Sequence, residues 1–333
     1  MALFLCPINT GTTHLGRIIV EYNLKDWKQT ALSLRAKGLS SRKIAAQVGV
    51  NKSSVNRYFI RYDLANQPIK PKVKILLLDV ETAPLLGFLW GTFKQNVGLN
   101  QLEAHSYMLT WAAKWLGETT CYSASLPDYP NYEPGSEDDS LLVADLLKLM
   151  NEADIIIGHN VKNFDDKVIR TRILINGLPQ PTPYKLVDTL EIAKQNFRFT
   201  SNKLDGIAIQ LGLQRKANTG GFELWRGCMR GYDEAWQHML NYNIQDVYVL
   251  EDVYMKLRAW DARHPNVALY EENDTINCTV CGSQNLTPVE KYNYTGVSVF
   301  TTYCCDDCGK HVRGRTSIKT KEQKQNIVMN IAR

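Results

Sequence analysis

The segment that most constrains the fold of this chain is residues 73–80, VKILLLDV. Its central residues are all apolar, so a strand formed here is buried on both faces and needs helices packed against each of them. Further strands and helices are expected along the following chain: strands at 106–117, 119–126 and 153–160, and helices at 140–153, 164–177 and over most of 183–258, with a break at Gly220 and Gly221. This alternation predicts an α/β sheet with helices on both faces.

Two acidic residues, Asp79 and Glu81, stand at the end of the first strand. Side chains two positions apart on a strand point to the same face, so these carboxylates lie side by side and repel each other unless a cation offsets their charge. Asp165 follows the strand expected at 153–160, at the start of a helix. Tyr242 and Asp246 are four residues apart and share one helical face. Four carboxylates and a tyrosine could therefore converge.

In sequence order these residues resemble the three motifs of the DEDD superfamily of 3′-to-5′ exonucleases, which have a ribonuclease H-like mixed sheet. The motifs are Asp79-Val80-Glu81-Thr82, Asn160-x3-Phe164-Asp165 and Tyr242-x3-Asp246. A tyrosine four residues before the last acid is typical of the DEDDy branch. Residues 73–258, including VDTLEIAKQNF and SNKLDGIAIQLGL, are similar to proofreading exonucleases related to family B DNA polymerases.

The resemblance implies hydrolysis of phosphodiester bonds with two Mg²⁺ or Mn²⁺ ions, which carboxylate oxygens bind well. The residues expected to hold these ions are Asp79, Glu81, Asp165 and Asp246. Tyr242 would be the fifth catalytic residue and would orient the attacking water. Asp188 is expected to provide a supporting hydrogen bond.

Other residues near the motifs are expected to meet the substrate. By the resemblance these are Thr82, Asn160 and Phe164. Trp90 and Phe93 could stack on unpaired bases, but packing at the edge of the core is the expected role.

The N-terminal part of the chain has a helical pattern over residues 25–63, after an unassigned segment at 1–24 and before a proline-containing linker at 64–72. It resembles the helix-turn-helix of recombinases and transposase-like DNA-binding proteins. In this small all-α domain, Ser40 and Asn51 are expected to cap the second and third helices, and Gly49 to permit the turn between them. The expected DNA contacts on the last helix are Lys52, Ser53, Asn56, Arg57 and Arg61. A small helical bundle used for packing or protein contacts is the alternative.

Cysteines near the C-terminus form two C-x2-C pairs separated by 23 residues, namely Cys278, Cys281, Cys305 and Cys308. This spacing resembles a small β zinc ribbon over residues 270–315, in which four thiolates bind one structural Zn²⁺. Cys304 could replace Cys305, although strand alternation favours Cys305. A basic tail at 316–333 and the ribbon could contact nucleic acid or a protein partner.

The formal net charge of +5 is unevenly distributed. Residues 25–62 carry nine Lys or Arg and one acid, whereas residues 73–260 carry 18 Lys or Arg and 23 acids. Basic ends around an acidic centre are typical of a protein that binds a polyanion and holds metal ions. No run of 18 apolar residues and no signal peptide are evident, so we expect a cytoplasmic protein without membrane contact.

These observations predict a metal-dependent 3′-to-5′ exonuclease that releases nucleoside 5′-monophosphates from DNA 3′ ends, single-stranded at the active site, and that the helix-turn-helix directs to DNA. One alternative is an RNA 3′-to-5′ exonuclease. A transposase-like nuclease is another, although such enzymes typically have Glu on the late helix. The last is a non-catalytic DNA-binding regulator built on a nuclease fold.

Overall fold

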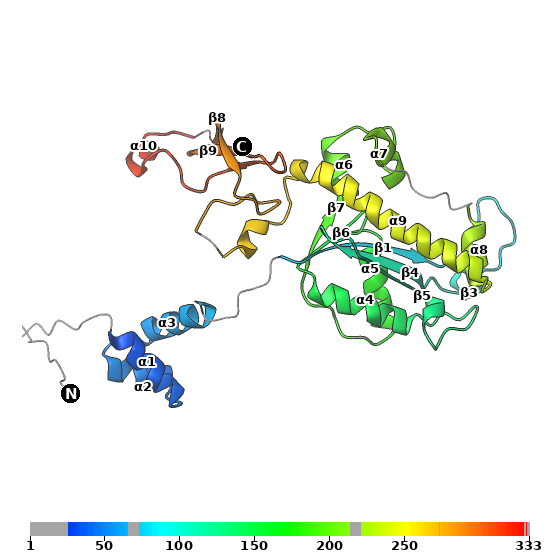
Figure 1. The fold of residues 1–333 in the computed structure, drawn as a ribbon, viewed down its shortest axis with the longest axis horizontal. Coiled ribbons are helices and arrows are strands. Elements are labelled where there is room, and N and C mark those ends of the chain that lie inside the picture. The colour runs from blue at the N-terminus through cyan, green and yellow to red at the C-terminus, as the bar shows by residue number, and fades with distance from the viewer. Residues whose placement is uncertain (1–25, 66–72, 214–220, 273, 330, 332–333) are drawn as a thin grey trace, which may run out of the picture. The chain divides into compact units, whose positions relative to one another are not determined.

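The structure is a computed structural model that describes residues 26–65, 73–213, 221–272, 274–329 and 331 (Figure 1). The chain divides into two compact units, Met1–Lys70 and Pro71–Arg333. The segment at 1–24 and most of the linker predicted at 64–72 lie outside the described residues.

The first unit contains α1 (Asp26–Ala36), α2 (Ser41–Val48) and α3 (Lys52–Ala65). Gly49 ends α2 in the left-handed conformation, with φ 71°, as a tight turn requires. Asn51 caps α3 as expected, because its Oδ1 accepts a hydrogen bond from the Ser54 N–H at 2.7 Å. Ser40 stands at the N-cap position of α2, as expected, but its side chain makes no capping bond. The buried core of this unit is Ala31, Ile44, Ala45, Val55 and Phe59.

The second unit is built on a five-stranded sheet of order β5-β4-β1-β6-β7. The strands are β1 (Ile75–Thr82), β4 (Met108–Trp115), β5 (Cys121–Ser125), β6 (Ile155–Gly158) and β7 (Lys185–Asp188). β1 pairs antiparallel with β4 and parallel with β6, which confirms a mixed sheet. The segment after Pro183 is mostly helical, as expected, but it begins with β7, which was not expected, because a four-residue strand is too short for its periodicity to be recognised. A small hairpin of β2 (Leu86–Gly87) and β3 (Leu102–Ala104) was also not expected.

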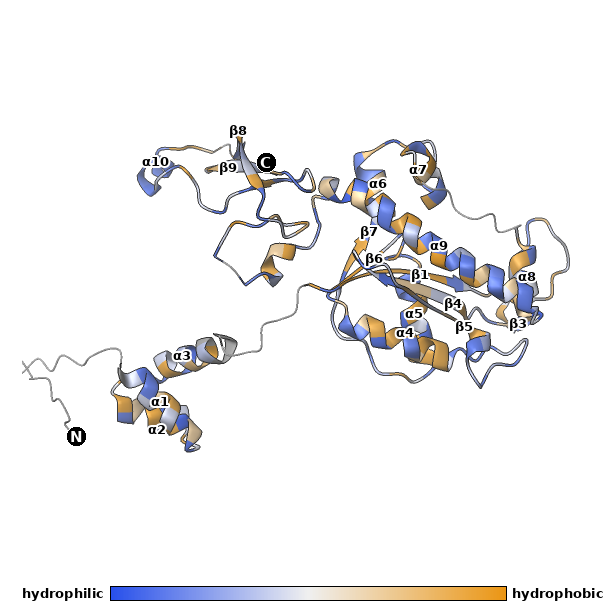
Figure 2. Cartoon of the chain, in the orientation of Figure 1, coloured by the Kyte–Doolittle hydropathy of each residue, from blue (hydrophilic) through white to orange (hydrophobic). Residues whose placement is uncertain are grey.

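Helices cover both faces of the sheet (Figure 1). They are α4 (Ser140–Glu152), α5 (Asp165–Ile175), α6 (Thr189–Asn196), α7 (Leu204–Gln210), α8 (Glu223–Met229) and α9 (Asp233–Leu257). Alternation along β1 divides the core: Leu76, Leu78 and Val80 pack with α4 and α5, whereas Ile75 and Leu77 pack with α6, α7 and the C-terminal half of α9. Figure 2 shows the hydrophilic and hydrophobic residues that alternate along α9. The predicted α/β class with flanking helices is confirmed.

The C-terminal part contains a three-stranded antiparallel sheet of order β10-β9-β8. The strands are β8 (Leu286–Tyr294), β9 (Val299–Cys305) and β10 (His311–Arg313), and a short helix, α10 (Lys321–Gln325), lies in the basic tail. Within the described ranges no helix combines the length and the apolar character needed to cross a bilayer.

Candidate active site and metal sites

Three of the four predicted acids meet where β1 ends. Asp79 and Glu81 continue the row of Ile75 and Leu77 on the face covered by α9, and Asp246 reaches them from that helix. One carboxylate oxygen from each of the three acids lies within 4.8 Å of the other two. Hard divalent cations prefer such a set of carboxylate oxygens, so the donor set fits Mg²⁺ or Mn²⁺.

Helix α9 also supplies two neighbours of this acidic group. Tyr242 precedes Asp246 by one helical turn and is buried. Asn243, which sequence reasoning missed, donates from Nδ2 to Asp79 Oδ2 at 2.7 Å. Its Oδ1 accepts a hydrogen bond from Thr110 Oγ1 at 3.1 Å. Because both partners of the amide are fixed, Asn243 holds Asp79 in one orientation.

Asp165, the fourth predicted acid, lies beside the group but outside it. It is the first residue of α5, and its Oδ1 accepts a hydrogen bond from the Val80 N–H at 3.2 Å. Val80 lies beyond Leu77 and Ile157, the last residue pair that joins β1 to β6. Burial raises the pKa of Asp165 to about 7, and the carboxylates of Asp188 and Asp166 act in the same direction. Metal binding by Asp165 stays a prediction.

Asp188 has the supporting role expected of it. It is buried at the end of β7, caps α6, and accepts hydrogen bonds from the backbone N–H groups of Leu190 at 2.9 Å and Glu191 at 3.4 Å. It also accepts from the N–H of Asn160 at 2.9 Å and of Lys162 at 3.2 Å. These bonds hold the start of the second motif against the end of the sheet. Asn160 has a left-handed φ of 70°, a conformation that asparagine adopts more readily than other non-glycine residues.

An open cleft of about 520 Å³ begins at Asp79. The residues that line it are Asp79, His159, Asn160, Leu190, Lys194, Asn202, Lys203 and Leu204. Two exposed cations, Lys194 and Lys203, stand at its edge, and the buried Oδ1 of Asn202 has no hydrogen-bond partner among the described residues. Sequence reasoning missed these three residues, although the segment SNKLDGIAIQLGL holds two of them. The cleft can therefore accept a ligand that carries negative charge and a hydrogen-bond donor.

The other residues expected to meet substrate lie at different places. Thr82 stands at a register shift between β1 and β4, and Phe164 is exposed just before α5. Both roles stay predictions. The expectation that Trp90 and Phe93 pack at the edge of the core is wrong, since they are 94% and 78% exposed.

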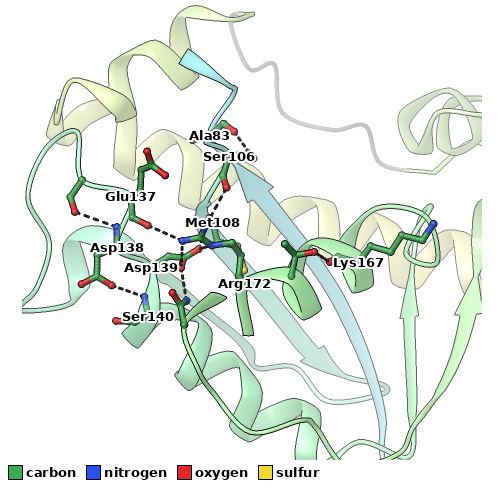
Figure 3. Close-up of polar contacts among 12 residues, drawn as sticks. Ala83, Ser106, Met108, Glu137, Asp138, Asp139, Ser140, Lys167 and Arg172 are labelled. Atoms are coloured by element: carbon green, nitrogen blue, oxygen red, sulfur yellow. Dashed lines mark hydrogen bonds and ion pairs between the residues drawn. The ribbon is translucent and has the colours of Figure 1, made fainter. Parts of the chain in front are cut away.

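A buried ion pair fixes the elements that surround the site (Figure 3). Arg172 of α5 donates to both oxygens of Asp139, at 2.7 and 2.9 Å, and Asp139 also accepts from the Met108 N–H at 2.8 Å. Ser106, whose carbonyl accepts from Arg172, donates to the Ala83 carbonyl at 2.7 Å. These bonds connect α5 to β4 and to the chain just after β1. Sequence reasoning did not identify them, because both charged residues lie outside the three motifs.

The four cysteines of the two C-x2-C pairs form the second candidate metal site, because their sulfur atoms lie within 4.8 Å of one another. Gly282 and Gly309 follow the pairs, both with φ 75°, and donate to the carbonyls of Cys278 at 3.0 Å and Cys305 at 2.8 Å. Desolvation raises the pKa of Cys305, but hydrogen bonds from the backbone N–H groups of Cys308 and Asp307 and from the neighbouring thiols together lower it below its usual value. Four convergent sulfurs fit a structural Zn²⁺. As strand alternation suggested, the group contains Cys305 and not Cys304.

The residues expected to contact DNA lie on α3. Lys52, Ser53 and Arg57 are exposed, and Asn56 is half-buried. The side chain of Arg61 lies outside the described residues. DNA binding by this face stays a prediction.

Comparison with known proteins bears on the second unit. A model of the RNase H superfamily matches residues 116–258, which include Asp165 and Asp246 and begin after Asp79 and Glu81. Among solved structures, the chain is similar to the family B DNA polymerase from the hyperthermophilic archaeon Pyrobaculum calidifontis, with 15% identity and a TM-score of 0.41. The similarity covers 58% of this chain and 26% of the polymerase, so the chain spans about a quarter of its length. No curated protein matches. The central sheet has a ribonuclease H-like fold, as predicted, and the four-cysteine sheet fits a zinc ribbon.

Proposed function

We propose that this protein is a metal-dependent 3′-to-5′ exonuclease that acts on DNA. The observation that carries the proposal is the meeting of Asp79, Glu81 and Asp246, whose oxygens lie within 4.8 Å of one another at the end of β1. The ribonuclease H-like fold supports a nucleic acid substrate and a hydrolytic reaction at phosphorus.

Each nearby side chain has a role in the proposed reaction. Divalent cations held by the acids would activate water and offset negative charge at the scissile phosphate. Asn243 keeps the Asp79 carboxylate in place through its bond of 2.7 Å. Tyr242 would orient the attacking water by a hydrogen bond. Lys194 and Lys203, at the edge of the cleft, would attract the phosphates of the strand that enters it.

The test uses single-stranded DNA labelled at its 5′ end, incubated with purified protein and Mg²⁺ or Mn²⁺. We expect a ladder of mononucleotide steps from the 3′ end and release of nucleoside 5′-monophosphates. Asp79→Ala and Asp246→Asn should lose this activity. Asp252→Asn, at an exposed position of α9, is the matched control and should keep it.

Other outcomes would exclude the proposal. Discrete internal cuts would indicate an endonuclease, and equal activity of wild type and Asp79→Ala would mean that the acidic group is not catalytic. A labelled RNA competitor in the same reaction decides between the two sugars, because preferential loss of RNA would replace DNA as the substrate.

We further propose that α3 directs the protein to duplex DNA. Lys52 and Arg57 are exposed on this helix and would contact phosphates. Arg57→Ala should weaken duplex binding and lower the slope of log K against log salt by about 1, as loss of one phosphate contact does. Lys37→Ala, also exposed in the same unit, is the control. An unchanged slope for Arg57→Ala would contradict this role.

The four cysteines would hold one structural Zn²⁺. Thiolate ligands on all four sides leave no open position for substrate, so this ion would stabilise the ribbon and take no part in hydrolysis. The ribbon and the basic tail would then serve as a further contact for nucleic acid or for a protein partner.

A further inference from the structure

Residues 85–99 form a loop that leaves the sheet directly after the strand carrying Asp79 and Glu81. Its aromatic rings point to solvent: Phe88, Trp90 and Phe93 are 67%, 94% and 78% exposed. Its other exposed apolar residues are Leu85, Leu86, Leu89, Val97 and Leu99. Soluble proteins seldom expose so many large apolar side chains along one short segment, and the three rings among them are suited to binding.

Hydrogen bonds join the two sides of the loop near its base. Gln101 Nε2 donates to the Phe88 carbonyl at 2.9 Å, and the Phe88 N–H donates to the Gln101 carbonyl at 2.8 Å. Gln101 Oε1 also accepts from the Gly98 N–H at 2.8 Å. The side chain of Gln101 thus bonds to Phe88 and to Gly98, and its backbone carbonyl bonds to Phe88 as well. These bonds join the two sides of the loop, and the exposed rings lie on or between the joined residues.

Ala83, just before the loop, is fastened to the chain that follows β3. The Ala83 N–H donates to the Tyr107 carbonyl at 2.9 Å, and Ser106 Oγ donates to the Ala83 carbonyl at 2.7 Å. Glu81 is two residues before Ala83 on the same strand. In the sequence, the exposed rings therefore follow shortly after the residues of the proposed site of hydrolysis.

The charge of the loop identifies the class of ligand. No acidic residue occurs between Thr82 and Leu102, and the single cation of this stretch, Lys94, places its Nζ 5.5 Å from the centre of the Phe93 ring. Unpaired nucleotides combine flat apolar bases with a negative backbone. A surface of aromatic rings that has a cation and no carboxylate suits both parts of such a ligand.

We propose that Phe88, Trp90 and Phe93 form a stacking surface for unpaired bases of the strand whose 3′ end enters the acidic site. The inference rests on the proposed function and deepens it, because it assigns the residues that hold the bases of the single strand outside the acidic site. Stacking on aromatic rings tolerates every base, so the surface binds strands without sequence preference.

The first test is a binding cycle in the Asp79→Ala background, which keeps the strand intact. Two probes are compared by fluorescence anisotropy: a single-stranded oligonucleotide, and the same strand with abasic sites at all but the 3′-terminal nucleotide. Replacing the three rings by alanine should weaken binding of the normal strand by about tenfold or more and leave binding of the abasic strand unchanged. Trp90→Phe should keep most of the affinity.

The matched control is Leu99→Ala, which removes an exposed aliphatic side chain from the same loop. It should bind the normal strand as the parent does, because it removes no ring. If the triple variant and the parent discriminate equally between normal and abasic strands, the rings do not stack on bases and the inference is wrong. Equal losses from Leu99→Ala and from the ring variants would also overturn it, because they indicate a general apolar surface such as a protein-docking site.

The second test separates this inference from the proposed function. In the triple variant with Asp79 intact, kcat/KM on the oligonucleotide should fall by about tenfold or more. On the p-nitrophenyl ester of thymidine 5′-monophosphate, which has no neighbouring bases, kcat/KM should be unchanged. Equal losses on both substrates would overturn the inference, because the loop would then support the site itself. If wild type cleaves neither substrate, the proposed function fails, and the binding cycle still decides whether the rings stack on bases.

Discussion

At the residue scale, the amide of Asn243 orients the Asp79 carboxylate. Asn243 is fully buried, donates to Asp79 and accepts from the buried hydroxyl of Thr110. Mutation of a group that holds a metal ligand in place commonly lowers metal affinity or activity by about 10- to 100-fold.

We therefore expect Asn243→Ala to lower Mn²⁺ affinity and exonuclease activity by about 10- to 100-fold, because Asp79 loses its fixed partner. Thr110→Val, which removes the more distant hydroxyl, should have a smaller effect in the same direction. Isothermal titration with Mn²⁺ and the labelled-strand assay measure the two effects. Wild-type metal affinity in Asn243→Ala would show that Asp79 needs no such support.

His264 is a second single residue with a measurable effect. Its Nδ1 bonds to the Pro265 carbonyl at 2.8 Å and must donate there, so the neutral ring accepts from the Tyr254 hydroxyl at Nε2, at 3.0 Å. Burial lowers the pKa of His264, because the charged ring would lose its hydration.

The lowered pKa gives stability a definite pH dependence. Below about pH 6.5 the unfolded chain binds a proton that the folded ring resists, so the free energy of unfolding should fall as the pH is lowered from 7 to 5. His264→Gln should make this decrease smaller, as measured by urea unfolding at several pH values. His105→Gln, at an exposed position, is the matched control. Identical pH slopes for wild type and His264→Gln would contradict the assignment.

At the scale of elements, one ion pair fixes α5 to β4 and to the loop after β1 (Figure 3). The side chains of Arg172 and Asp139 are 7% and 0% exposed. Removing one partner of such a pair leaves an uncompensated charge in a dry environment, which costs about 3 to 5 kcal/mol.

Arg172→Met should therefore lower the free energy of unfolding by about 3 to 5 kcal/mol in urea titrations. Arg172→Lys keeps the charge but not the two-pronged geometry and should lose less. Lys148→Met removes a partner from the exposed pair with Asp145, and its effect should stay within about 1 kcal/mol. Equal effects of Arg172→Met and Lys148→Met would mean that burial adds nothing to the first pair.

At the scale of the whole molecule, the chain is assembled from parts that have their own cores. The apolar clusters on the two faces of the ribonuclease H-like sheet and the cluster around the four cysteines contain different residues. The cysteine cluster is small, with Cys278, Val280 and Cys305 as its buried members. A core of this size needs a metal ion to hold it, whereas the sheet has an extensive apolar core.

Metal removal should therefore unfold the ribbon selectively. Cys305→Ser should lose bound Zn²⁺ and become sensitive to protease over residues 270–315, while the central sheet stays folded. Cys304→Ser is the matched control and should retain one Zn²⁺ per chain, since Cys304 is not in the sulfur group. Elemental analysis and limited proteolysis measure the two effects. Loss of zinc from Cys304→Ser would reverse the assignment of the ligand.

Features that depend on local rules could be predicted from the amino-acid sequence alone. Period-two alternation put Asp79 and Glu81 on one face of a buried strand, and the fixed spacing of the C-x2-C pairs, each followed by Gly282 or Gly309, determined the two turns of the ribbon. Asn51 could be predicted as a helix cap because its bond reaches only three residues along the chain. The fold class follows from the same local patterns, summed over the elements.

Which distant residues meet depends on tertiary packing, and no local pattern predicts it. Asn243 reaches Asp79 across 164 positions, and Arg172 meets Asp139 across 33, so no local pattern marks either pair. The strand β7 forms by pairing with the edge of β6. Lys194 and Lys203 line the cleft because α6 and α7 pack beside it. The exposure of Trp90 could not be predicted locally either. Its hydrophobicity alone favours burial, and only the packed structure shows that its ring lies outside the core.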